Sequence, residues 1–130
     1  MRVNFSEAAK RHFKDGDILM NAERMMNASQ LFGLAAECAL KAVLCKRGLL
    51  TIGSTGAPQK EFKVHIDELW GIYNSRMNGP SDNHFLMQPN SPFTDWHIAH
   101  RYHGDRECLA SSLHKQHAGA SLALQKLQLD

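Results

Sequence analysis

The side chains best suited to chemistry lie close together between positions 96 and 106. This stretch reads WHIAHRYHGDR and holds three histidines, two arginines, a tryptophan and a tyrosine. Aromatic planes beside guanidinium and imidazole groups suit stacked bases and phosphate oxygens, and arginine binds phosphate in a forked, two-bond geometry. We therefore interpret Trp96, His97, Arg101 and Tyr102 as candidate ligand-binding residues. The alternative is a packed hinge of Trp and Tyr with solvated histidines.

The histidines of this stretch also allow catalysis or metal binding. In RNA cleavage, His97, His100 or His103 would activate the 2′-hydroxyl, and Arg101 or Arg106 would stabilise charge on the phosphate. The spacing by three places the histidines on one side of a helix, but structural zinc sites usually add cysteine or a carboxylate at recognised spacings. The chain contains no HExxH, CxxC, P-loop, dinucleotide fingerprint or nucleophile elbow. We therefore interpret these residues as surface histidines and expect neither a metal nor a cofactor.

A second candidate is a charged couple in the most apolar part of the chain. Glu37 and Lys41 are one helical turn apart, in the favourable order for an ion pair. A carboxylate buried without a partner is strongly unfavourable, so Glu37 needs a route to solvent or a cation from another helix. We predict that Glu37 faces Arg101 across the bundle and orients it. The alternative is a purely structural ion pair between Glu37 and Lys41.

These residues must be positioned by helices. The apolar stretch from Asn27 to Gly48 predicts a central helix, with Asn27 or Ser29 as its N-cap and Gly48 closing it. The other predicted elements are a helix capped by Ser6 and ending before the link 22–26, helices over 63–77 and 105–127, and a short helical segment after Thr94 or Asp95. The irregular stretch 80–92 is predicted to be a long loop or an ordered excursion. No run of residues alternates as a strand does, so we expect an all-α, up-and-down bundle of four main helices plus a short one.

Length and composition fit one soluble domain spanning residues 1–130. Apolar residues make up 43% and charged residues 22%. The net charge of +2 is too small to indicate nucleic acid by itself, although eight histidines add positive charge below about pH 6.5. The N-terminal residues do not resemble a signal peptide, and Glu37 and Lys41 argue against a membrane span in the central stretch. With three cysteines in apolar surroundings, we expect a cytoplasmic protein without membrane contact.

Three segments, in order along the chain, carry motifs of one known family. ASQLFGLAAECALKAVLCKRG contains an aromatic-Gly-x-Ala-Ala-Glu-x-x-Leu-Lys run, VHIDELW contains a His followed by Leu-Trp, and DWHIAHRY contains Trp-x-x-x-x-Arg-Tyr. The matching residues are Phe32, Gly33, Ala35, Ala36, Glu37, Leu40, Lys41, His65, Leu69, Trp70, Trp96, Arg101 and Tyr102. Together these segments resemble the HEPN domains, the helical nucleotide-binding domains of higher eukaryotes and prokaryotes.

The resemblance implies a helical bundle that often dimerises and that has RNA or nucleotide partners. Members include RNA-cleaving toxins, paired with nucleotidyltransferase-like antitoxins, and non-catalytic binding modules. The RNA-cleaving members carry Arg, four to six further residues, and then His. Here Arg101 is followed too closely by His103, and seven residues separate Arg106 from His114, one too many. Whether the chain is an enzyme stays open, and we assign no catalytic residue.

We therefore expect an HEPN-like homodimer that binds RNA or a nucleotide, as a module or as a component of a toxin–antitoxin-type system. Its expected site residues are Glu37, Lys41, Trp96, His97, Arg101 and Tyr102. One alternative is a metal-independent ribonuclease toxin. Another is a protein whose partner is a nucleotidyltransferase-like chain.

Overall fold

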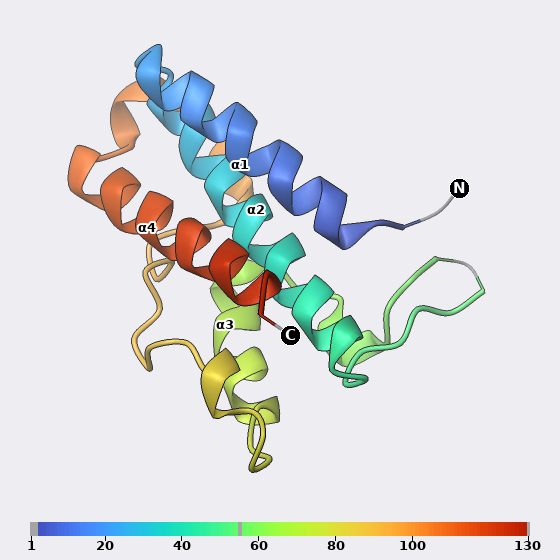
Figure 1. The fold of residues 1–130 in the computed structure, drawn as a ribbon. Coiled ribbons are helices and arrows are strands. Elements are labelled where there is room, and N and C mark those ends of the chain that lie inside the picture. The colour runs from blue at the N-terminus through green and yellow to red at the C-terminus, as the bar shows by residue number, and fades with distance from the viewer. Residues whose placement is uncertain (1–2, 55, 130) are drawn as a thin grey trace.

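The computed structural model describes residues 3–54 and 56–129, and these fold into a bundle of four α-helices without a β-strand (Figure 1). The α-helices are α1 (Phe5–Asn21), α2 (Met25–Lys46), α3 (Ile66–Arg76) and α4 (Ala110–Leu127). Four short 3₁₀ turns lie in the connections: η1 (Lys60–Phe62), η2 (Asn83–Phe85), η3 (Ile98–Tyr102) and η4 (Asp105–Glu107). The predicted all-α bundle of four main helices is confirmed. The predicted short helical segment is the 3₁₀ turn η3, which is capped by His97 and not by Thr94 or Asp95 as predicted.

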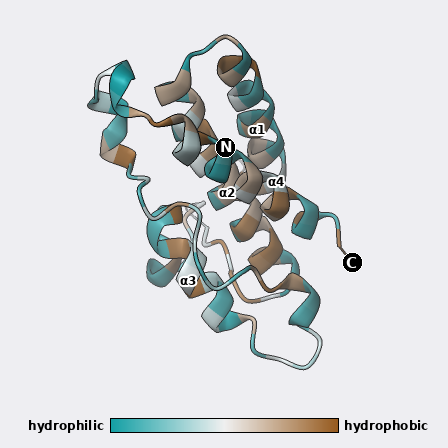
Figure 2. Ribbon diagram, turned by 90° about the vertical axis from the view of Figure 1, so that its left-hand side faces the viewer, coloured by the Kyte–Doolittle hydropathy of each residue, from teal (hydrophilic) through white to brown (hydrophobic). Residues whose placement is uncertain are grey.

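Helix α2 is the centre of the bundle and packs against α1, α3 and α4 (Figure 1). Its small residues let neighbours approach closely; a Cβ on Gly33 would lie 2.1 Å from the ring of Trp96. Larger side chains then fill the space around it, among them Phe32, Leu40 and Leu44, all fully buried. In Figure 2 the hydrophobic residues lie mainly towards the middle of the bundle, along α2 and the adjoining sides of its neighbours. Burial of this apolar surface is the main stabilising contribution to the fold.

The predicted caps of α1 and α2 were wrong. Asn4, not Ser6, caps α1, because its side-chain oxygen accepts a hydrogen bond of 3.0 Å from the backbone N–H of Glu7. Helix α2 begins at Met25, so that Asn27 and Ser29 both lie inside the helix rather than at its end. The reason is the tight link before it, in which Glu23 has a φ of 60° and lets the helix restart almost at once.

The C-terminal end of α2 forms as predicted. Gly48 has a φ of 75°, the left-handed conformation in which helices commonly end. The start of α4 differs from the prediction, since residues 105–107 form the separate turn η4 and the helix begins only at Ala110. The connection before α4 is therefore longer and more irregular than the pattern indicated.

Helix α2 is long and apolar enough, by length and composition, to cross a membrane. Most of its apolar surface is buried inside the bundle, as in the core helix of a soluble protein. Length and composition alone therefore do not identify it as a membrane span.

Candidate functional site

Glu37 does not face Arg101, so this prediction was wrong. Its carboxylate oxygen Oε2 accepts a hydrogen bond from Nζ of Lys41 at 3.0 Å, and Oε1 lies 2.9 Å from Nδ1 of His65. The backbone explains the difference. Glu37 lies in the middle of α2 beside the start of α3, whereas the segment with Arg101 lies at the N-terminal end of α2, where Gln30 donates a hydrogen bond to the carbonyl of His97 at 2.9 Å.

The Glu37–Lys41 couple is therefore a structural ion pair, the alternative considered from the sequence. Glu37 is 8% exposed and Lys41 is 6% exposed, so both charges are removed from water. Such a pair is tolerated because each charge compensates the other and His65 supplies a further partner at the protein surface. Glu37 links α2 to His65 at the start of α3, and neither Glu37 nor Lys41 forms a ligand site with Arg101.

Trp96 is part of the core. Its side chain is 2% exposed, and its indole N–H donates a hydrogen bond of 2.9 Å to the carbonyl of Ser29. One face of the ring packs on the backbone of Gly33, where no side chain larger than hydrogen fits. Trp96 was predicted to stack on a ligand, and this is wrong because its ring is enclosed by the bundle. It anchors the segment that follows it.

The residues after Trp96 form an exposed segment, 97–106, which we call the basic–aromatic segment. Arg101 and Tyr102 are both exposed, with the guanidinium carbon of Arg101 4.8 Å from the centre of the Tyr102 ring. The rings of His97 and His100 are 6.3 Å apart, and those of His100 and His103 are 4.8 Å apart. In a 3₁₀ turn, residues three apart eclipse one another, so the histidines line up on one side as their spacing predicted.

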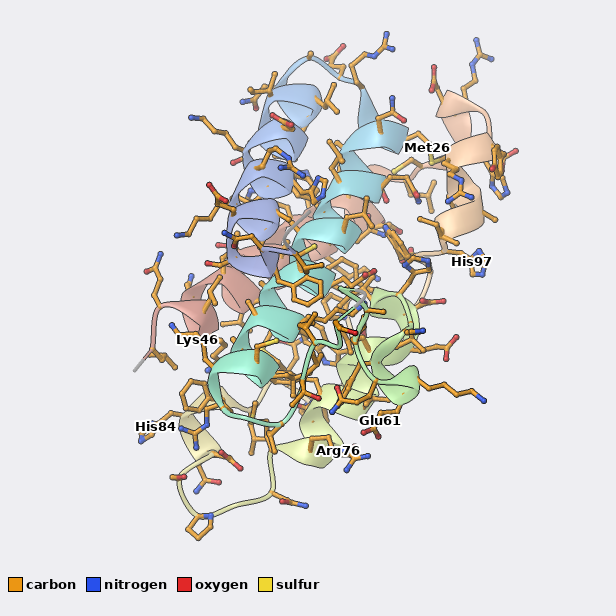
Figure 3. All side chains as sticks on the ribbon, turned by 90° about the vertical axis from the view of Figure 1, so that its right-hand side faces the viewer. Met26, Lys46, Glu61, Arg76, His84 and His97 are labelled. Carbon is orange, nitrogen blue, oxygen red and sulfur yellow. The ribbon has the colours of Figure 1, made fainter. Side chains whose placement is uncertain are left out.

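The position of this segment is set by both of its ends. Trp96 fixes its start, Gln30 binds the carbonyl of His97, and the start of α4 fixes its end. Figure 3 shows His97 near Met26, at the end of α2 opposite to Lys46. The structure thus brings His97, Arg101 and Tyr102 together at the surface and separates them from Glu37, Lys41 and Trp96.

The histidines of this segment are neighbours but do not form a metal site. Within residues 3–54 and 56–129, no three His, Cys, Asp or Glu side chains are arranged to hold a metal ion. His103 instead pairs with Glu107, with 3.2 Å between Nδ1 and Oε2.

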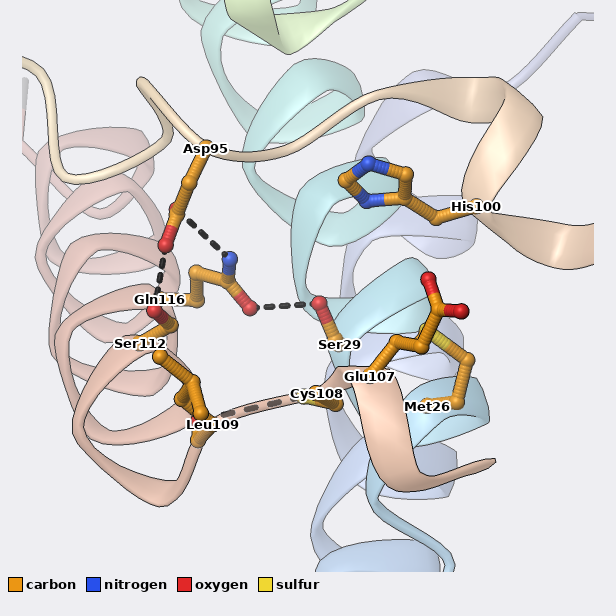
Figure 4. Close-up of a pocket in the computed structure, with 9 residues that line it drawn as sticks. All are labelled: Met26, Ser29, Asp95, His100, Glu107, Cys108, Leu109, Ser112 and Gln116. Atoms are coloured by element: carbon orange, nitrogen blue, oxygen red, sulfur yellow. Dashed lines mark hydrogen bonds between the residues drawn. The ribbon is translucent and has the colours of Figure 1, made fainter. Parts of the chain in front are cut away.

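A cavity of about 190 Å³ lies beside the basic–aromatic segment, between the starts of α2 and α4 (Figure 4). A network of hydrogen bonds forms part of its wall. The Ser29 hydroxyl donates to Oε1 of Gln116 at 2.5 Å, the Gln116 amide donates to Oδ1 of Asp95 at 3.2 Å, and the Ser112 hydroxyl donates to Oδ2 of Asp95. His100 belongs to the basic–aromatic segment and also lines the cavity.

Asp95 and Cys108, which both line the cavity, have shifted pKa values. Burial raises the pKa of Asp95, but the hydrogen bonds from Ser112 and Gln116 outweigh it, and the net pKa lies below the ordinary value. Asp95 is therefore ionised at neutral pH. Burial raises the pKa of the Cys108 thiol, which makes it a poor nucleophile.

This cavity could not be found from the sequence. Its network joins Ser29, Asp95, Ser112 and Gln116 from three distant parts of the chain. These residues form no motif, and the sequence suggested only helix capping for Ser29 and Asp95. The one available signal was the position of Asp95 directly before the Trp96–Arg106 cluster.

Comparisons with known proteins add no relative to this description. No family model matches the chain, and neither curated proteins nor solved structures match it significantly. The resemblance to HEPN domains therefore depends on the sequence motifs alone.

Proposed function

We propose that this chain is an HEPN-like module that binds single-stranded RNA through the basic–aromatic segment. The observation that carries the proposal is the exposure of Tyr102. This side chain is 76% exposed, the largest fraction among the large apolar side chains of the described residues. The other tyrosine, Tyr73, and both tryptophans are buried. An aromatic ring left in water forgoes about 1.5–3 kcal/mol of burial, which favours a role in binding.

The neighbours of Tyr102 match the chemistry of a nucleotide. The Arg101 guanidinium lies against the tyrosine ring, which restricts its motion while its N–H groups stay free to bind a phosphate. Stacking of a base on an aromatic side chain contributes about 1–3 kcal/mol and tolerates any base. Arg106 and the histidines add further donors, while Asp105 and Glu107 offset part of the positive charge. We therefore expect stacking to contribute more than net charge.

The proposal is tested by fluorescence anisotropy with a labelled single-stranded RNA of about 12 nucleotides. Tyr102→Ala is expected to weaken binding by about 1–3 kcal/mol at every salt concentration. Arg101→Ala is expected to weaken binding and to reduce the slope of log K against log salt by about 0.7, the contribution of one phosphate contact to a single strand. The matched control is Arg11→Ala, which removes an exposed arginine from α1.

Equal affinities of wild type, Tyr102→Ala and Arg101→Ala would overturn the proposed site. The RNA recovered from the same samples is run on a denaturing gel. Cleavage that disappears in His100→Ala would favour the ribonuclease alternative, in which His97, His100 or His103 acts with Arg101.

The wider biological setting in this proposal follows from the family resemblance. It comprises a cytoplasmic homodimer and a toxin–antitoxin-type system with a nucleotidyltransferase-like partner. Light scattering of the purified chain tests the dimer, and co-purification with the product of an adjacent gene tests the partner. A monomer that co-purifies with no such product would restrict the proposal to an isolated binding module.

A further inference from the structure

The cavity beside the basic–aromatic segment has the size of one small ring. Its volume is about 190 Å³, and a protein cavity of about 150 Å³ accommodates benzene. A six-membered ring with two substituents therefore fits. Met26 and Leu109 supply apolar surface for the faces of such a ring.

The polar wall of the cavity presents more acceptors than donors, since only the second N–H of the Gln116 amide is not used within the network. Asp95 is a carboxylate and can only accept, so the Gln116 amide must turn its N–H towards it and its oxygen towards Ser29. The single hydroxyl hydrogens of Ser29 and Ser112 are used within the network. The oxygens of Asp95, Ser29 and Ser112 retain lone pairs. The wall thus favours a ligand that brings its own hydrogen-bond donors.

The other side of the cavity adds a donor and a connection to the surface. Figure 4 shows His100 and Glu107 across the cavity from Asp95 and Ser112. A histidine ring nitrogen can donate to a ring nitrogen or carbonyl of a ligand. Because His100 belongs to the basic–aromatic segment, a ligand in the cavity would be continuous with a strand lying on that segment.

Among nucleobases, cytosine matches this arrangement. It has one ring and an exocyclic amino group that can donate a hydrogen bond to a carboxylate. The same edge of the base also carries hydrogen-bond acceptors. Uracil has the same size but places a carbonyl oxygen where cytosine has the amino group, and that oxygen would face Asp95. We propose that the cavity binds one cytosine base of the RNA strand held by the basic–aromatic segment. This inference rests on the RNA binding proposed above and adds its base preference.

The test compares oligo(C) and oligo(U) of equal length in the anisotropy assay. Wild type is expected to bind oligo(C) about tenfold more tightly, the discrimination typical of a well-placed base contact. Asp95→Asn places an amide N–H₂ group at the wall and is expected to abolish this preference while affinity for oligo(U) is kept. Asp15→Asn, an exposed change in α1 outside the basic–aromatic segment, is the matched control and is expected to keep the preference.

A second variant covers the case in which Asp95→Asn fails to fold. Leu109 lines the cavity and is 64% exposed, so Leu109→Trp narrows the cavity without changing the core. This variant is also expected to lose the preference for oligo(C). Circular dichroism of each variant verifies that the helical bundle is intact.

The outcomes separate the two proposals. Binding that depends on Tyr102 but is equal for oligo(C) and oligo(U) overturns the cytosine site and leaves RNA binding in place. If no RNA binds, free cytidine and uridine are added to isotope-labelled protein. Changes in the amide chemical shifts of Ser29 and Gln116 with cytidine but not with uridine would support the cytosine site in the cavity and would overturn the proposed RNA binding. No shifts with either nucleoside would overturn both.

Discussion

The connection between α3 and α4 has two parts, residues 77–96 and 97–109, both built from turns and irregular backbone. In the first part, side chains of α3 form hydrogen bonds with the backbone of residues 85–88. Tyr73 donates to the carbonyl of Phe85 at 2.6 Å, Trp70 donates to the carbonyl of Gln88 at 2.9 Å, and Asn74 bonds both backbone groups of Met87. Phe85, Met87, Phe93 and Trp96 are all buried.

The second part makes its hydrogen bonds locally. The backbone N–H of His100 donates to the carbonyl of His97 at 3.0 Å, and the backbone N–H of His103 donates to the carbonyl of His100 at 2.9 Å. Among the residues of η3 and η4, none is buried. Irregular backbone is therefore compatible with two roles. In residues 77–96, side chains of α3 provide hydrogen-bond partners for the backbone, and the side chains of this part fill the core. In residues 97–109, short 3₁₀ turns provide the backbone hydrogen bonds, and the side chains are wholly or partly exposed and can bind a ligand.

The largest expected effect comes from removing the residue at the boundary between the two parts. Trp96→Ala should lower the free energy of unfolding by about 3–5 kcal/mol, because it deletes a buried ring and leaves a cavity beside Gly33. Urea denaturation at neutral pH measures this. Trp96→Phe keeps a ring in place and loses the hydrogen bond to Ser29, so its effect should be smaller. A loss below about 1 kcal/mol in Trp96→Ala would contradict the description of residues 77–96 as an anchored part of the core.

A smaller effect, dependent on pH, is expected at the ion pair that holds the start of the anchored part. Asp82 accepts from Arg47 at 2.5 Å and from the backbone N–H of Gly79 at 2.9 Å. The Arg47 hydrogen bond, followed by the Gly79 bond, lowers the pKa of Asp82. A lowered pKa in the folded state adds stability above the unfolded value of about 4, and this contribution is lost as the pH falls through the lower folded value.

The measurement is the difference in unfolding free energy between wild type and Asp82→Asn from pH 7 to pH 2. The difference should be constant above about pH 5 and shrink below about pH 4. Arg47→Ala should remove most of this pH-dependent component, because the Arg47 hydrogen bond is the main cause of the shift. A difference that stays constant down to the lowest pH would show that the carboxylate of Asp82 makes no such contribution.

The smallest effect is expected in the exposed part. Tyr102→Ala should change the free energy of unfolding by less than about 0.5 kcal/mol, as for surface substitutions that break no buried contact. Thermal denaturation of wild type and variant checks this. The same substitution is predicted above to weaken RNA binding, so stability and binding should separate at this position. A clear drop in melting temperature would instead mean that Tyr102 packs against the bundle or against a second copy.

Much of the fold could be predicted because it depends on local patterns. The apolar girth of α2 identified it as the central helix, and Gly48 marked its end. Capping was harder to predict, since Asn4, Ser6, Asn27 and Ser29 are all residue types that cap helices. Which of these residues caps a helix depends on where the helix begins. The start of α1 at Phe5 makes Asn4 its cap, and the tight turn at Glu23 places the start of α2 before Asn27 and Ser29.

The candidate site was predictable only in part. Arg101 and Tyr102 are adjacent in the sequence, and their proximity to His97 and His100 follows from a turn of a few residues. The partner of Glu37 was not predictable, because His65 and Arg101 are both distant along the chain and only packing decides which one lies at the middle of α2. The same holds for the cavity, whose wall combines Ser29 with Gln116 across 87 positions.

Local sequence patterns were enough to predict the four main helices, the central place of α2 and the clustering of basic and aromatic side chains after Trp96. These depend on interactions over a few residues, such as hydrophobic periodicity, turn chemistry and short spacings. Long-range packing is needed to explain why Trp96 is buried while Tyr102, only six positions later, is exposed. Burial depends on whether a neighbouring element leaves room for the ring. Gly33 in α2 leaves room for the indole of Trp96, whereas Tyr102 is 76% exposed and no element within residues 3–54 and 56–129 covers it.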